Sequence, residues 1–163
     1  MMTGYSIDLQ IDDDLPNEQR PLSATLDLLE TAVVTTLKQQ QSPKAALTVF
    51  LTDDGRIQQL NRDFLGHDKP TDVLSFPAGV PMPGMETLAT YLGDIIIALP
   101  YAARQAAAAG HDADAELQLL AVHGALHLLG HDHAAPEEKA IMWAAQTAVL
   151  TQLGLAHITP TEN

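Results

Sequence analysis

The segment HGALHLLGHDH at residues 123–133 constrains this chain most, because it holds four of the seven histidines in 163 residues. His123 and His127 are four positions apart, so on a helix they share one face, one turn apart. Gly130 favours the left-handed backbone that ends a helix, after which the chain can turn back and bring His133 beside the first two. The fold must therefore combine a helix, a glycine turn and a third imidazole around one point.

This spacing predicts a metal site. Three imidazoles leave a fourth coordination position open, which is typical of catalytic rather than structural zinc sites. The chain has no cysteine, so a metal must be held by His, Asp or Glu. We predict one zinc ion per chain, bound by His123, His127 and His133, with His131 as a surface residue.

Two carboxylates are candidates to orient a ligating imidazole by accepting its free N–H. Asp132 lies between two histidines, and Asp94 interrupts the apolar run of residues 95–98. A buried charge needs a partner, which favours such a role for Asp94. The alternatives are that Asp94 caps a backbone turn and that Asp132 lies in solvent.

The residue after the first histidine separates this motif from a class of zinc peptidases with the same ligand spacing. Those enzymes place a glutamate there as general base, whereas this chain has Gly124. Glycine cannot move a proton, so another group does so or the reaction differs. A zinc site can also activate water for attack on a phosphodiester. A metallopeptidase-like hydrolase therefore remains an alternative that Gly124 disfavours.

Periodicity along the chain predicts four strands and five helices. Ser23 is a candidate N-cap for a helix whose apolar face starts at Leu22, and Phe64 is expected on the apolar face of a short helix. Strands are expected at 5–11, 46–52, 72–77 and 91–98, and helices at 23–37, 54–64, 99–109, 114–129 and from 136 onward. This order predicts an α+β fold in which a small four-stranded sheet is covered by helices, with a zincin-like zinc site on a helix in the C-terminal half. No repeat or linker divides it, so one domain over residues 1–163 is expected.

Composition limits the function classes. No apolar run approaches the ~20 residues of a membrane-spanning helix, and the N-terminus is acidic, unlike a signal peptide. Together with the absence of cysteine, this favours a cytoplasmic protein without a membrane partner. The net charge of −13 repels nucleic acid over most of the surface. An RNA substrate would need a local basic patch, a metal or a partner protein.

Three segments together resemble the bacterial YbeY-type rRNA maturation factors, which are metal-dependent endoribonucleases. They are HGALHLLGHDH at 123–133, LNRDFLGHDKPTDVLSFP at 60–77 and LGDIII at 92–97. The resemblance implies one α+β domain with a small mixed sheet and a zinc ion on His123, His127 and His133. It also implies single-strand RNA cleavage in 16S rRNA 3′-end maturation, ribosome quality control, and ribosomal or ribosome-associated protein partners.

The chain departs from the family pattern at two positions. His131 stands where the family usually has tyrosine. Leu65 stands where the family usually has an arginine tied to activity, so a guanidinium that could hold a phosphate is missing. Arg62, about one helical turn earlier, is our candidate catalytic substitute, ahead of Lys69 and Arg56.

The sequence therefore predicts a zinc-dependent endoribonuclease with His123 in its catalytic centre. Because Leu65 replaces the arginine, a non-catalytic ribosome-associated factor with a structural metal remains a second alternative. Ser75 and Phe76 are candidates to line the edge of a substrate cleft. The remaining expectations are packing roles for Trp143, Met82 and Met85, and exposed side chains without partners for His67, His111 and His157.

Overall fold

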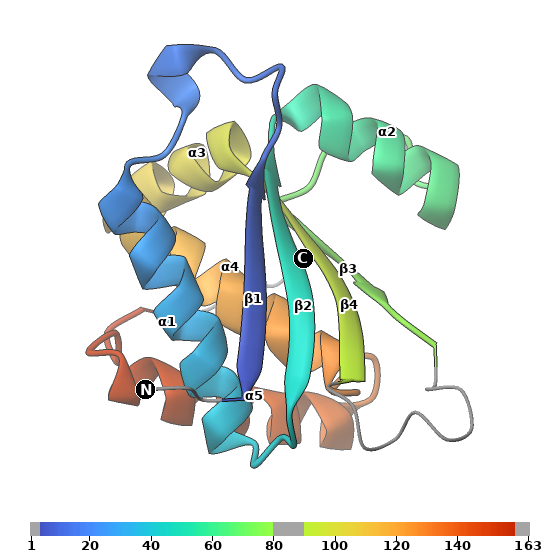
Figure 1. The fold of residues 1–163 in the computed structure, drawn as a ribbon, viewed down its shortest axis with the longest axis vertical. Coiled ribbons are helices and arrows are strands. Elements are labelled where there is room, and N and C mark those ends of the chain that lie inside the picture. Colours follow the sequence, from blue (N-terminus) through green and yellow to red (C-terminus); the bar gives the residue numbers. More distant parts are fainter. Residues whose placement is uncertain (1–3, 80–89, 159–163) are drawn as a thin grey trace.

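The computed structural model describes residues 4–79 and 90–158, which form an α+β fold around one four-stranded mixed sheet (Figure 1). The strand order is β1-β2-β4-β3, and β3 pairs antiparallel with β4 while the other pairs are parallel. The strands are β1 (Tyr5–Ile11), β2 (Ala45–Thr52), β3 (Val73–Pro77) and β4 (Thr90–Ala98). β3 is therefore an edge strand.

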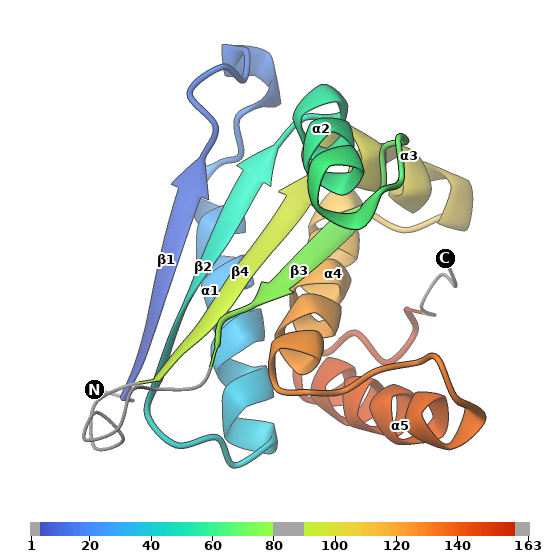
Figure 2. The ribbon, with the colours of Figure 1, turned by 90° about the vertical axis from the view of Figure 1, so that its right-hand side faces the viewer.

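Five α-helices flank this sheet. They are α1 (Ser23–Gln39), α2 (Asp54–Leu65), α3 (Leu99–Ala109), α4 (Ala113–Leu128) and α5 (Pro136–Gln152). Figure 2 shows α1 and α4 on one face, with α5 below them, and α2 across one end of the opposite face. Among the described helices, none is both long and apolar enough to cross a membrane.

The main core lies between the sheet and α1 and α4. Alternate side chains of β2 and β4, such as Leu47, Val49 and Ile97, point into it and are buried. α4 contacts α1, α3, α5 and the sheet, which explains why its sequence is apolar nearly all round. A smaller cluster under α2 contains Ile57, Leu74, Ile96 and Ala98.

The predicted fold class and elements agree with this structure, with strand and helix boundaries shifted by a residue or two. Ser23 is wrong as an N-cap: it is the first helical residue, and Leu22 occupies the N-cap position at 75% exposure. Phe64 was expected on the apolar face of α2, but it is 68% exposed: it contacts Phe76 edge-on and is not among the side chains packed against the cluster under α2. The packing predicted for Met82 and Met85 falls outside the described residues.

Candidate metal centre

The three predicted ligands come together. His123 and His127 lie in the last turns of α4, His133 lies in the loop before α5, and one nitrogen of each lies within 4.8 Å of the others. Gly130 turns the chain with a φ of 100°, while the His131 amide bonds back to the Leu126 carbonyl at 3.0 Å. Local helix geometry and one glycine therefore create the cluster.

Neighbouring polar groups hold the loop that carries His133. Asp132 is exposed, and its Oδ1 accepts a hydrogen bond from the backbone N–H of His133 at 2.7 Å. It thus bonds to the backbone of His133, which fits the alternative that Asp132 lies in solvent better than a contact with an imidazole. The ring of His131 turns to α1, where its Nε2 lies 2.7 Å from Oε1 of Gln40.

Hydrogen bonds on the far side of two rings define which nitrogens are available to a metal. Nδ1 of His127 lies 2.9 Å from the carbonyl oxygen of His131, and Nδ1 of His123 lies 3.0 Å from Oε1 of Gln146. A carbonyl oxygen only accepts, so the tautomer that satisfies both contacts carries the hydrogen on each Nδ1 and leaves a lone pair on each Nε2. These two Nε2 atoms are 3.1 Å apart, an arrangement that a shared cation would stabilise.

Burial keeps these rings neutral. It lowers the pKa of His123 to about 4, with a further decrease from the nearby charge of His127. Burial also lowers the pKa of His127. Metal binding requires deprotonated ligands, so this donor set fits a divalent metal ion at neutral pH.

Helix α5 contributes two residues that sequence reasoning did not assign to the site. Gln146 is fully buried against His123, and the indole of Trp143 contacts His123 and His133 edge-on, with ring centroids 5.9 and 5.6 Å apart. A signal existed for Gln146, because it is a polar residue in the buried row that also holds Met142 and Val149. The packing role predicted for Trp143 is therefore packing against the ligands themselves.

The histidines open onto a cleft of about 630 Å³. Its other wall includes Val73 and Ser75 of the edge strand β3, together with Leu65 at the end of α2 and His67 in the loop after it. Ser75 lines the cleft as predicted, whereas Phe76 points to the opposite sheet face. An extended strand of substrate can therefore lie along β3 beside the histidines.

Gly124 faces the sheet, away from this cleft. A Cβ at this position would lie 2.7 Å from Cγ2 of Ile95, closer than van der Waals contact allows. The carbonyl of Gly124 also accepts a hydrogen bond from the Ser75 hydroxyl at 3.3 Å. The glycine that replaces the peptidase glutamate thus permits the close approach of α4 to β4.

Two predicted site residues do not reach the cluster. Asp94 lies on the opposite sheet face, where it accepts a hydrogen bond from Tyr91, so it does not orient an imidazole here. Arg62 points to solvent and donates to Asp63 at 3.0 Å, with Asp68 at 4.0 Å. The hydrogen bond to Asp63 raises the pKa of Arg62. Leu65 lines the cleft, so the position where an arginine was expected faces it with an apolar side chain.

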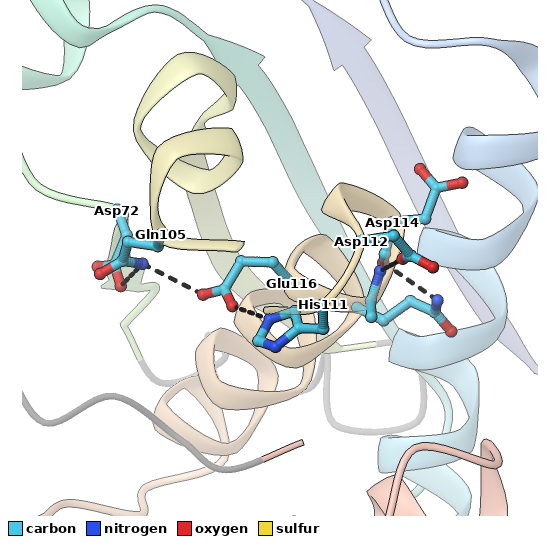
Figure 3. A network of polar contacts seen from close by, with 8 residues as sticks. Asp72, Gln105, His111, Asp112, Asp114 and Glu116 are labelled. Carbon is cyan, nitrogen blue, oxygen red and sulfur yellow. Dashed lines mark hydrogen bonds and ion pairs between the residues drawn. The ribbon is translucent and has the colours of Figure 1, made fainter. Parts of the chain in front are cut away.

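A second polar network lies at the other end of α4 (Figure 3). Glu116 is 1% exposed, and its Oε1 lies 2.6 Å from Nε2 of His111. The Gln105 amide donates both to Oε2 of Glu116 at 3.1 Å and to Oδ2 of Asp72 at 3.0 Å. The expectation that His111 is exposed without a partner is wrong, because its ring bonds to Glu116 in the first turn of α4 and is largely buried.

This network connects α3 and α4 to the start of β3. Asp72 is buried, accepts the Val73 amide at 2.7 Å and lines the cleft. Burial raises the pKa of Glu116, while the hydrogen bond from His111 opposes that rise. The network thereby supports the cleft wall opposite the histidines.

Comparisons with known proteins match most of this chain to one family. The family model described as Endoribonuclease YbeY matches residues 12–154. A protein named Endoribonuclease YbeY from Desulforamulus reducens is 42% identical over 133 residues, covering 80% of this chain and 87% of the relative. One of the same name from Brevibacillus brevis is 40% identical over 151 residues, covering 86% and 95%.

A solved structure supports the fold. The solution structure of TM1509 from Thermotoga maritima matches with a TM-score of 0.57 and 22% sequence identity, covering 96% of this chain and 99% of that one. At this identity the likeness concerns the arrangement of helices and strands alone.

Proposed function

We propose that this chain, which belongs to the Endoribonuclease YbeY family, is a zinc-dependent endoribonuclease whose substrate is single-stranded rRNA. The proposed role is 16S rRNA 3′-end maturation and ribosome quality control in the cytoplasm. The single observation that carries the proposal is the convergence of three histidine nitrogens at the wall of an open cleft. We further propose that residues 1–163 act as one domain.

His123, His127 and His133 are the proposed zinc ligands, one ion per chain. Zinc, when bound, supplies positive charge and a Lewis acid beside a scissile phosphate. The chain itself contributes the orientation of the rings: the His131 carbonyl holds His127, and Asp132 holds the backbone of His133. Trp143 packs against the rings and limits their contact with solvent.

The charges around the cleft support the proposal that partner proteins deliver the RNA. Neither lysine nor arginine is among the described residues that line the cleft, and the net charge is −13. Ribosomal or ribosome-associated proteins are therefore the proposed partners. Arg62 stays a proposal as the phosphate-binding cation, and it would have to leave Asp63 and Asp68 to act.

One alternative function has an observation in its favour. Leu65 at the cleft supports a ribosome-associated factor that binds metal without cleaving RNA. A metallopeptidase is disfavoured, because Gly124 carries no base and faces the sheet.

Cleavage of a structured rRNA fragment with a single-stranded 3′ tail tests the proposal. We expect the zinc-loaded protein to cut the tail and His123→Ala to leave it intact. Cleavage of a peptide library instead of RNA would favour the peptidase. A folded, zinc-loaded protein that binds ribosomal subunits but cuts neither would favour the non-catalytic factor.

A further inference from the structure

Gln146 has a specific relation to the proposed metal centre. Its side chain is fully buried on α5, between Met142 and Val149 in the buried row of that helix. Its Oε1 lies 3.0 Å from Nδ1 of His123. Among the described residues, its Nε2 is buried and has no hydrogen-bond partner. Burial of an amide with an unbonded N–H costs free energy, so an apolar side chain would be more stable at this core position. The contact that Oε1 of Gln146 makes with His123 therefore indicates a functional role.

We propose that Gln146 is a positioning residue that holds His123 in the tautomer that presents Nε2 to the metal. A neutral imidazole carries one N–H, and a carbonyl acceptor at Nδ1 keeps the hydrogen there. The inference rests on the metal site of the proposed function, and it concerns a residue outside the three ligands.

The competing state explains why the tautomer matters. If the hydrogen of His123 moved to Nε2, it would point to Nε2 of His127, which is 3.1 Å away and carries a lone pair. The two rings would then form a hydrogen bond with each other, and both nitrogens would be unavailable to a cation. His127 cannot prevent this alone, because its own hydrogen is held at Nδ1 by the His131 carbonyl. Gln146 therefore disfavours the state in which the two histidines bond to each other. It favours the state in which both Nε2 atoms are available to bind a metal.

An amide performs this task without adding charge. Carboxylates and backbone carbonyls commonly accept the second N–H of a metal-bound histidine. In this chain the acidic candidates Asp94 and Asp132 do not contact the His123 ring, and Gln146 occupies the accepting position. The group that accepts the N–H of His123 is therefore itself uncharged.

The test combines zinc affinity with direct observation of the tautomer. We expect Gln146→Met to weaken zinc binding by about 10–100-fold in competition with a chelator of known affinity. Gln146→Glu, which keeps the acceptor, should bind at least as tightly as wild type. Gln118→Met is the matched control, because Gln118 is also buried but bonds to the Asp114 carbonyl within α4.

Nitrogen-15 NMR of the metal-free protein supplies the readout that a packing role would not change. Wild type should show His123 protonated at Nδ1, and Gln146→Met should shift the hydrogen toward Nε2. The proposal is overturned if metal-free wild type carries the hydrogen at Nε2, or if Gln146→Met folds and binds zinc within twofold of wild type. It is also overturned if Gln146→Glu binds as weakly as Gln146→Met.

These outcomes separate this inference from the proposed function. If wild type binds no zinc, the proposed metal is wrong, while the tautomer measurement still decides the role of Gln146. If Gln146→Met does not fold, the wild-type tautomer and Gln146→Glu decide it.

Discussion

The two ends of α4 bury histidines in opposite ways. At the N-terminal end, His111, Glu116 and Gln105 satisfy one another, since donors face acceptors throughout. At the C-terminal end, the Nδ1 atoms of His123 and His127 face oxygen acceptors, and their two Nε2 atoms lie 3.1 Å apart without a further acceptor or donor of the described residues between them. The difference teaches that burial and residue type do not identify a metal site, whereas the balance of donors and acceptors does.

Burial disfavours charge at both ends, but the neighbours differ. At Glu116 burial raises the pKa, and His111 opposes the rise. At His123 burial lowers the pKa, and His127 adds to the decrease. The first end forms a structural network, and the second keeps neutral nitrogens ready for a cation.

Removal of a ligand should have the largest effect. His127→Ala leaves two imidazoles, so we expect zinc affinity to fall by more than about 100-fold and RNA cleavage to be lost. Metal analysis of the purified protein and a cleavage assay measure this. His111→Ala, at the other end of α4, should keep one zinc per chain. Equal loss of zinc in both variants would contradict the contrast between the two ends.

Breaking the closed network should affect stability instead. His111→Ala removes the nearest hydrogen-bond partner of the buried Glu116, so the free energy of unfolding should decrease by about 2 kcal/mol. Urea unfolding of the metal-free protein measures it. Glu116→Gln, which keeps the shape and removes the charge, should cost less. An unchanged unfolding midpoint in His111→Ala would show that the network contributes little.

The pH dependence of metal-free protein should differ in sign between the ends. The pKa of His123 is about 4 in the folded state and 6.5 is its ordinary value, so the unfolded chain binds the extra proton between these limits. Stability should therefore fall as pH decreases from 6.5 to 4, by at most about 3 kcal/mol for this residue. Urea unfolding across this range measures the slope, and His123→Gln should reduce it.

Glu116 should contribute the opposite slope. Its pKa is raised above the ordinary 4.5, so the folded state holds the proton longer, and stability falls as pH rises above 4.5. Glu116→Gln should remove that decrease. If the dependence of the unfolding free energy on pH is the same in Glu116→Gln and wild type, ionisation of the buried Glu116 costs little free energy.

Addition of a cation to the cleft should have the smallest effect. Leu65→Arg places a guanidinium at the cleft wall, where a charge-assisted hydrogen bond to phosphate should raise kcat/KM for RNA by about tenfold. Arg62→Ala tests the proposed substitute: it should lower kcat/KM if Arg62 leaves Asp63 to hold the phosphate. A change of less than about twofold would remove Arg62 as the phosphate-binding residue.

The parts of the site that follow from local geometry could be predicted from sequence. The spacing of His123 and His127 and the turn at Gly130 depend on helix period and one backbone conformation. The roles of Gln146 and His111 depend on how distant helices dock, which periodicity does not encode.

The sequence left two roles open for Asp94 for a related reason. Ile95, Ile96 and Ile97 make β4 apolar on both faces, so the sequence does not show to which face Asp94 points. The topology decides it: the register pairs Asp94 with Thr48, on the face away from α4.

The contact between Gly124 and Ile95 limits how this scaffold can be re-engineered. A glutamate at position 124, as in the peptidases, would place a side chain between α4 and β4. It would push α4, which carries His123 and His127, away from the sheet. Conversion to a peptidase would therefore require a larger spacing between α4 and the sheet. A single substitution of Gly124 by glutamate would displace the histidines of the metal centre.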